Sequence, residues 1–343
     1  MIESLSFNDD YSRFIVATCN GFLVYETDPY LYKFSRHEFE GGLKIAKVFG
    51  STGIISFVGT GKHEERPENV AFLWDQREEQ IITSMQCTEE IKMIIPQLPL
   101  LAVITDKLVF MFQFGDETVQ MPKHEIDQGT YECVLLKYLK GKVMLIYPSS
   151  KNLGTVIIQK YKANKNGKFE EFNVLKIPAH QNKIRKLATN STGTLLLTCS
   201  VCGTLIKIFD TDTGNKIQEL RRGLDTAQIL DCCFSPKSDF ITVVSSKGTL
   251  HIYSLNDVKK DRPENKKSSF SFISNVLPSY FSSEWSFAKT TLDPEWVEAG
   301  LIVTFGRDQS IIVIVKNGKY IRYHFNTINQ SIEKDKEDRW CDI

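Results

Sequence analysis

The chain has 343 residues, equal numbers of basic (42) and acidic (42) side chains, and a hydrophobic fraction of 42%. The formal charge of zero argues against a protein that coats nucleic acid, and no run reaches the ~18 to 20 uncharged apolar residues of a membrane-spanning helix. The acidic start MIESLSFNDD lacks a secretory signal pattern and the eight cysteines are scattered, so we expect reduced thiols in a cytoplasmic protein.

Short β-rich runs follow one another along the chain, with hardly any helical periodicity. In chain order they include FIVAT, FLVYET, IISFVG, VAFLW, LLAVIT, KLVFMF, KVMLIY, TVIIQKY, LLLTCS, TLIKIF, FITVVS, TLHIYS, LIVTF and SIIVIV. Alternating or continuous β-branched and aromatic residues between turn signals predict an all-β protein.

The runs belong to a repeat. A slide of about 45 residues superposes IRKLATNSTGTLLLTCSVCGTLIKIFD on ILDCCFSPKSDFITVVSSKGTLHIYSL, and the opening FNDDYSRFIVATCNGFLVY matches the second copy. A period near 45 made of four short strands is typical of a β-propeller blade. We therefore predict a single seven-bladed β-propeller over 1–343, WD-repeat-like, with blades at about 2–40, 43–86, 90–126, 130–178, 180–222, 226–292 and 297–343.

The LRRG motif at 220–223 stands at the junction of the fifth and sixth predicted blades. Successive strand side chains point to opposite faces, so Arg221 and Arg222 would serve different pockets. Arginine binds phosphate bidentately and hydroxyls satisfy the remaining oxygens, which favours two phosphate sites. Nearby donors are Ser200, Thr204 and His180 for the first, and Ser245, Lys247, Thr249 and His251 for the second. The alternative is structural: arginines pair across blades while the hydroxyls cap turns.

One connection, 256–284, breaks the strand pattern over about thirty residues, where propeller loops usually have two to six. Its first half, NDVKKDRPENKK, is charged, and its second half, SSFSFISNVLPSYFSS, is uncharged and rich in aromatic residues. The pattern indicates a polar stalk with an apolar tip. We expect the two pockets to belong to the rigid blades and this loop not to line them.

The last predicted blade contains LIVTF, SIIVIV and YIRYHF, and an Asn317-Gly318 hairpin joins the second to the third. The weak tail SIEKDKEDRWCDI is the candidate for its fourth strand. Because the first blade has four strands of its own, the ring is expected to close without exchange of the N-terminal strand.

Three segments around the motif closely resemble blades 5 and 6 of the PROPPIN family of polyphosphoinositide-binding propellers: AHQNKIRKLATNSTGTLLLTCS, GTLIKIFDTDTGNKIQELRRG and FSPKSDFITVVSSKGTLHIYSL. LRRG is similar to the yeast homologous-with-swollen-vacuole-phenotype branch. The resemblance implies two rim pockets for phosphatidylinositol 3-phosphate and 3,5-bisphosphate. The first would comprise His180, Ser200, Gly203, Thr204 and Arg221, and the second Arg222, Ser245, Lys247, Thr249 and His251. The family's Glu-Lys-Gly-Thr reads Val201-Cys202-Gly203-Thr204 here, so the first pocket loses a lysine.

The same resemblance implies that 256–284 is a membrane-inserting loop of blade 6. Lys266 and Lys267 can lie at anionic headgroups while apolar residues enter the interface. The apolar residues expected there are Phe270, Phe272, Ile273, Val276, Leu277, Tyr280 and Phe281, with Trp285 beside them. The alternative is a loop folded back over its own blade.

The resemblance implies a monomeric, non-catalytic phosphoinositide effector, peripherally bound to endosomal, vacuolar and preautophagosomal membranes. It would act in autophagy, including degradation of nuclear fragments, and in protein transport, with an autophagy lipid-transfer scaffold as a partner and no nucleic acid or cofactor. No nucleophile-elbow, P-loop or zinc-protease motif appears, and Cys199-x-x-Cys202 lacks a second ligand pair, so neither an enzyme nor a metal site is expected. The alternative function is a WD-repeat scaffold that joins proteins without binding lipid.

Overall fold

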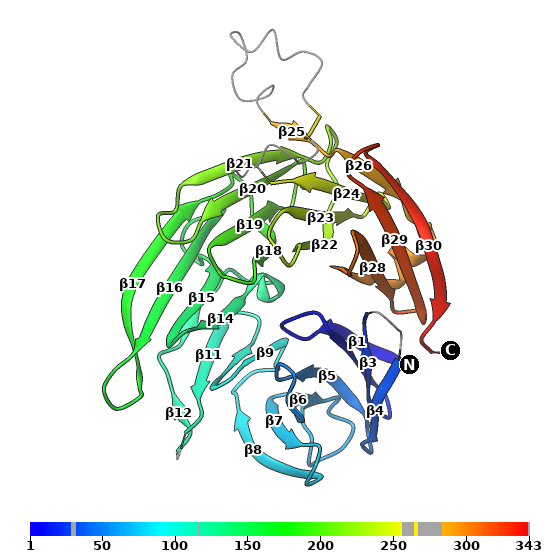
Figure 1. Ribbon diagram of the computed structural model, residues 1–343. Helices are drawn as coiled ribbons and strands as arrows, with labels where there is room; N and C mark the ends of the chain where they lie inside the picture. Colours follow the sequence, from blue (N-terminus) through cyan, green and yellow to red (C-terminus); the bar gives the residue numbers. More distant parts are fainter. Residues whose placement is uncertain (29–31, 116, 256–263, 267–282, 342–343) are drawn as a thin grey trace. The chain divides into compact units, whose positions relative to one another are not determined.

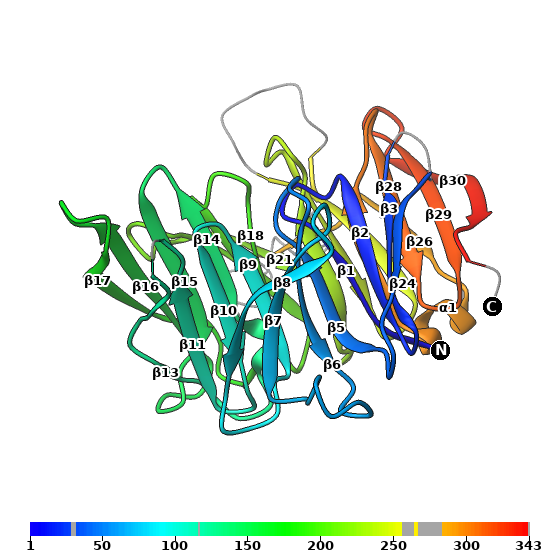
Figure 2. The same cartoon turned by 90° about the horizontal axis from the view of Figure 1, so that it is seen from below.

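The computed structural model describes residues 1–28, 32–115, 117–255, 264–266 and 283–341 (Figure 1). In this part of the chain the strands form seven sheets, and neighbouring strands are antiparallel except for one short parallel pair. Figure 2 shows the same sheets from a second side. The fold class is the predicted one, an all-β seven-bladed propeller. Its contacts divide the chain into unit 1, 1–152 with 157–174, and unit 2, 153–156 with 175–343.

Four sheets begin in unit 1. The first contains β1 (Ile2–Phe7), β2 (Arg13–Thr18), β3 (Gly21–Glu26) and β4 (Tyr32–Glu38). The second contains β5 (Leu43–Val48), β6 (Ile54–Gly59), β7 (Val70–Asp75) and β8 (Gln80–Gln86). The third contains β9 (Met93–Gln97), β10 (Leu100–Ile104), β11 (Leu108–Gln113), β12 (Val119–Gln120) and β13 (His124–Glu125). After a 3-10 turn (Tyr131–Cys133), the fourth contains β14 (Leu135–Leu139), β15 (Lys142–Pro148), β16 (Thr155–Ala163) and β17 (Phe169–Pro178).

Three sheets lie in unit 2. The fifth contains β18 (Ile184–Thr189), β19 (Leu195–Ser200), β20 (Leu205–Asp210), β21 (Lys216–Arg221) and β25 (Glu284–Trp285). The sixth contains β22 (Ile229–Phe234), β23 (Phe240–Ser245), β24 (Thr249–Ser254) and β26 (Ala288–Thr291). Helix α1 (Pro294–Ala299) leads to the seventh, which contains β27 (Leu301–Phe305), β28 (Ser310–Val315), β29 (Lys319–Asn326) and β30 (Ser331–Arg339).

The ends of the chain complete their own sheets. β1 pairs with β2, and the tail 331–339 pairs with β29 as the fourth strand of the seventh sheet. This confirms that the N-terminal strand stays in the first sheet. The turn between β28 and β29 is also as predicted, because the Gly318 amide donates to the Val315 carbonyl at 3.1 Å. None of the helices in the described ranges is long and apolar enough to cross a bilayer.

The core lies between neighbouring sheets, because inner strands such as β10, β19 and β28 bury side chains on both faces. In unit 2, Leu197, Cys199 and Leu220 of the fifth sheet pack with Cys232 and Tyr253 of the sixth. Full burial of a large aliphatic side chain contributes roughly 1.5 to 3 kcal/mol. Cys232 and the adjacent Cys233 are 5% and 2% exposed, so both are packing residues as predicted. The packed pair of sheets gives the LRRG segment a rigid support.

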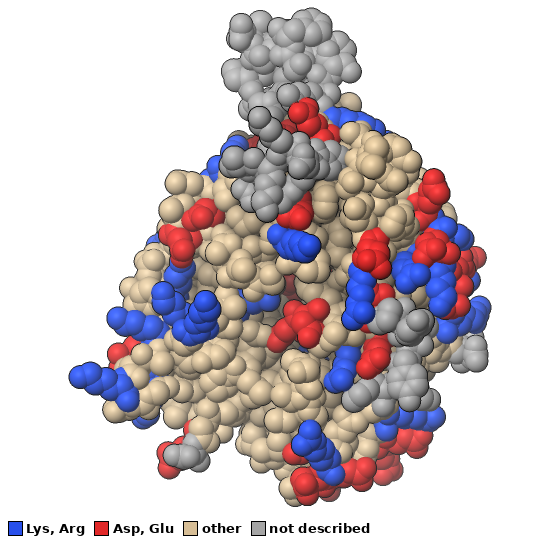
Figure 3. All heavy atoms as spheres, viewed as in Figure 1, with Lys and Arg blue, Asp and Glu red and all other residues tan. Residues whose placement is uncertain are grey.

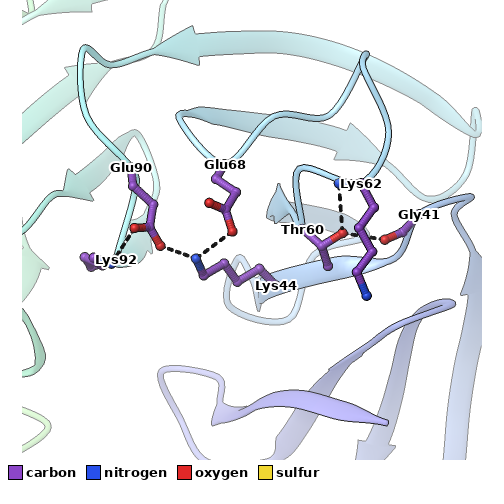
Figure 4. Close-up of polar contacts among 7 residues, drawn as sticks. All are labelled: Gly41, Lys44, Thr60, Lys62, Glu68, Glu90 and Lys92. Carbon is purple, nitrogen blue, oxygen red and sulfur yellow. Dashed lines mark hydrogen bonds and ion pairs between the residues drawn. The ribbon is translucent and has the colours of Figure 1, made fainter.

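Ion pairs fix loops of unit 1 (Figure 4). The Lys44 ammonium lies between the carboxylates of Glu68, at 2.9 Å, and Glu90. Lys92 contacts Glu90 at 2.5 Å, and the two lysines lower the pKa of Glu90. With its charges paired internally, this cluster is a structural feature of the loops.

Candidate functional site

Arg221 ends β21 and is only 6% exposed. Its Nε donates a hydrogen bond of 3.0 Å to the Ser283 hydroxyl, and its carbonyl accepts one of 3.0 Å from the Tyr253 hydroxyl. The strand β25 runs parallel beside β21 (Figure 1). In this pair Arg221 lies opposite Trp285. The guanidinium is therefore held at the edge of the fifth sheet by a residue distant in sequence.

Arg222, also 6% exposed, bonds to different segments. Its Nε donates to the Gly203 carbonyl at 3.0 Å, its Nη2 contacts the Asp225 carbonyl, and its amide donates to the Thr204 carbonyl at 2.9 Å. The two guanidiniums thus have separate partners, as the alternation of strand side chains predicts. Gly203 and Thr204, placed by resemblance with Arg221, contact Arg222 through their backbones.

The turn before β20 requires glycine. Gly203 has φ +59°, and a Cβ there would lie 1.9 Å from the Ala227 carbonyl oxygen. The Gly203 amide donates to the Ser200 carbonyl at 3.0 Å, and Gly248 makes the same contact with Ser245 at 2.9 Å one repeat later. The repeat therefore sets Ser200 and Ser245 at equivalent turn positions in the fifth and sixth sheets.

His180 lies with Thr198 and Lys207, two residues that are not among the predicted pocket residues. Its Nε2 is 2.9 Å from the Thr198 hydroxyl, and the neighbouring Lys207 donates to the Ala179 carbonyl at 2.8 Å. Burial lowers the pKa of His180 to about 4, and the nearby charge of Lys207 contributes to this shift. Lys207 places a cation beside His180, whereas the sequence had led us to expect that the predicted first pocket lacks a lysine. The sequence did not predict this role for Lys207, because the 45-residue repeat places an isoleucine, Ile252, at the equivalent position of the sixth sheet.

The second set gathers on β24 and the turn before it. The Ser245 and Thr249 hydroxyls lie 3.2 Å apart, and His251, 5% exposed, has its Nδ1 3.0 Å from the Ser286 hydroxyl. Burial and the charge of Arg222 lower the pKa of His251 to about 4. Lys247 pairs with the Asp225 carboxylate at 2.8 Å. The carboxylate of Asp225 therefore already neutralises one of the cations predicted for the second pocket. Asp225 was missed although it follows the arginines closely.

The two histidines predict a loss of stability on mild acidification. Their folded pKa of about 4 lies below the usual 6.5, so between those values only the unfolded chain binds the extra proton. Above pH 6.5 their effect is constant, and below it the free energy of unfolding should fall by about 1.4 kcal/mol per pH unit for buried His251. Urea unfolding at pH 7.0 and 5.0 measures this slope. His251→Gln should flatten it, and an equal slope in both proteins would contradict the assignment.

The long connection departs from the prediction at its ends. Lys266 and Trp285 exchange backbone hydrogen bonds of 3.1 and 2.7 Å, and Trp285 belongs to β25. We expected the loop not to line the pockets, and this is wrong at Ser283, whose hydroxyl contacts Arg221. The reason is that the returning chain pairs with β21. The predicted insertion residues lie outside the described residues, as does Lys267: Phe270, Phe272, Ile273, Val276, Leu277, Tyr280 and Phe281.

A metal-ligand cluster and a separate cavity are the other features to consider in the described chain. No group of three metal-ligating side chains occurs in the described ranges. A cavity of about 490 Å³ lies between β26, α1, β29 and β30, and its lining includes none of the predicted pocket residues. Its Lys319 and Lys334 both pair with Glu337. On the face shown in Figure 3, acidic and basic side chains are interspersed, in line with the zero net charge.

Comparisons with known proteins identify the family and the fold. The PROPPIN family model matches residues 44–283. The chain is 29% identical to Autophagy-related protein 18e of Arabidopsis thaliana, over 95% of this chain and 84% of that protein. It is 28% identical to SVP1-like protein 2 of Saccharomyces cerevisiae, over 84% and 73% respectively. The solved structure of Kluyveromyces lactis Hsv2 matches 99% of both chains with a TM-score of 0.82 at 22% identity, which shows the fold.

Proposed function

This chain belongs to the PROPPIN family of non-catalytic, phosphoinositide-binding β-propellers, and on that premise we propose that it binds phosphatidylinositol 3-phosphate and 3,5-bisphosphate at two pockets divided by Arg221 and Arg222. The single observation that carries the proposal is the divergence of these two buried guanidiniums, one toward Ser283 and the other toward Gly203 and Asp225. Arg222 acts electrostatically on His251, and Arg221 ends the strand beside the returning Ser283. Each guanidinium can offer bidentate donors to one phosphate.

The family context extends the proposal to cellular role. The chain acts as a monomeric peripheral effector on endosomal, vacuolar and preautophagosomal membranes, in autophagy that includes degradation of nuclear fragments. The autophagy-related name of one relative supports this role. An autophagy lipid-transfer scaffold is the proposed protein partner. Two weak sites on one rigid body reinforce each other through effective concentration, so both contribute to membrane avidity.

Flotation tests the proposal directly. The protein should float with liposomes that contain phosphatidylinositol 3-phosphate or 3,5-bisphosphate and remain at the bottom with liposomes that lack phosphoinositide. The alternative, a WD-repeat scaffold without lipid binding, predicts no flotation with any of them. Recovery in the bottom fraction in all three cases would therefore refute lipid recognition.

A second prediction separates the pockets. His180→Ala with Thr204→Ala should disable the first, and Thr249→Ala with His251→Ala the second, because each pair removes side chains that we assign to one pocket. Calorimetric titration with a water-soluble headgroup should then fall from two bound equivalents to about one in each double variant. A wild-type stoichiometry of one would contradict the two-site model. In that case we expect the first pocket to be the empty one, because Cys202 stands where the family has a lysine and Lys207 already donates to the Ala179 carbonyl.

A further inference from the structure

The segment Ser283–Ser286 contacts one basic side chain of each proposed pocket. Ser283 is 2% exposed, and its hydroxyl accepts the Nε–H of Arg221 at 3.0 Å. Three residues later the Ser286 hydroxyl, in a residue 7% exposed, lies 3.0 Å from His251 Nδ1. A single short stretch of chain therefore holds groups that belong to two different pockets.

A dense set of bonds fixes this stretch in place. We call residues 264–266 and 283–286 the neck. In it, Glu284 accepts hydrogen bonds from Gln218 Nε2 at 2.8 Å and from Asn265 Nδ2 at 2.7 Å. Asn265 is 6% exposed and bonds both the amide and the carbonyl of Ser254, at 2.8 and 2.7 Å. The neck is thus anchored to β21 on one side and to β24 on the other.

The chemistry of the two contacts concerns orientation. A guanidinium whose Nε–H is held by a fixed hydroxyl cannot rotate freely about its long side chain, so its plane is set before a ligand arrives. A hydroxyl on one ring nitrogen likewise fixes the orientation of a buried imidazole. Ordering these groups beforehand reduces the conformational entropy that anion binding must remove.

We propose that Ser283 and Ser286 are positioning residues, which orient Arg221 and His251 for phosphate groups and make the neck a shared support of both pockets. This inference rests on the proposed function. The competing explanation is that the two hydroxyls only satisfy buried donors. That role would alter stability and leave the affinity for phosphate unchanged, so the two explanations are separable.

The test uses the full chain and inositol 1,3-bisphosphate, the water-soluble headgroup of phosphatidylinositol 3-phosphate, in calorimetric titration. Ser283→Ala should weaken the Arg221 site about tenfold and change the other site less than about twofold, and Ser286→Ala should do the reverse. Ser283→Thr keeps the hydroxyl and should restore most of the affinity. Ser310→Ala is the matched control, because Ser310 is a buried serine of the same unit whose hydroxyl bonds the Arg307 carbonyl at 2.6 Å.

The outcomes are distinguishable. Unchanged affinity in Ser283→Ala, with a loss of stability like that of Ser310→Ala, would overturn the inference alone. No binding to the unmodified protein would overturn the proposed function and this inference with it. If Ser283→Ala does not fold, hydrogen exchange of the unmodified chain decides. Saturating headgroup should slow exchange of the Trp285 amide, which donates to the Lys266 carbonyl, by at least about fivefold, and an unchanged rate would overturn the inference.

Discussion

Replacing Arg221 and Arg222 together with threonine is expected to abolish phosphoinositide-dependent liposome binding. Charge-assisted hydrogen bonds contribute about 1.5 to 3 kcal/mol each, so loss of one arginine should weaken binding about 10- to 100-fold. Loss of both removes the principal cation from each pocket. Flotation of the single and double variants over a phosphatidylinositol 3-phosphate series measures the effect.

The control must separate lipid binding from folding, because Arg222 also bonds the Gly203 carbonyl and contacts that of Asp225. Urea unfolding of each variant shows whether the fold is retained. Arg322→Thr is a matched control: this arginine of β29 is paired with Asp335 at 2.7 Å and is absent from the predicted pockets. It should float normally. A double variant that folds and still floats with liposomes like the unmodified chain would contradict the two-arginine model.

The fold was predictable because a blade is a local structure. Apart from β25, which joins the fifth sheet from between β24 and β26, each sheet is made of strands that follow one another along the chain. Its hydrophobic alternation and turn residues therefore lie within one stretch of sequence, and the repeat multiplies the signal. The predicted fifth blade, about 180–222, contains β18 to β21, and the weak tail did form β30. Strand β25 escaped prediction because two residues carry no periodicity and their partner, β21, lies about sixty residues away in sequence.

In the site, too, features that depend on adjacent residues could be predicted, and contacts between distant residues could not. Alternation along a strand suffices to predict that Arg221 and Arg222 diverge, since it depends only on adjacency. The contacts of Ser283 with Arg221 and of Ser286 with His251 join residues far apart in sequence, and serine is common in loops. Lys207 was missed for a related reason, because a lysine in a strand is ordinarily a solvent-facing residue. Only the packed sheets reveal that it lies beside His180.

Replacing Phe270–Phe281 with a Gly-Ser linker of equal length is expected to abolish stable membrane association. Burial of apolar surface contributes about 25 cal/mol per Å², so two inserted aromatic side chains of ~150 Å² each would contribute several kcal/mol. Loss of that free energy would lower the membrane partition coefficient by more than a thousandfold. These residues lie outside the described part of the chain, so the expectation rests on their composition and on the family. Sedimentation with phosphoinositide liposomes measures the loss.

The linker has the length of the segment it replaces because the neck on either side contacts the proposed pockets. Because Ser283 contacts Arg221, a deletion that shortened the connection would displace Ser283 and alter the proposed first pocket. Loss of membrane insertion and loss of headgroup binding could then not be told apart. An equal-length linker that keeps Lys266 and Ser283 should leave headgroup affinity in solution within about twofold, since the Lys266–Trp285 backbone pair remains. A protein-only scaffold predicts the opposite pattern, with partner binding altered and liposomes irrelevant. An environment-sensitive fluorophore at position 272 decides between them: insertion requires a blue shift on phosphoinositide vesicles, and an unchanged spectrum on vesicles that demonstrably bind the protein would refute it.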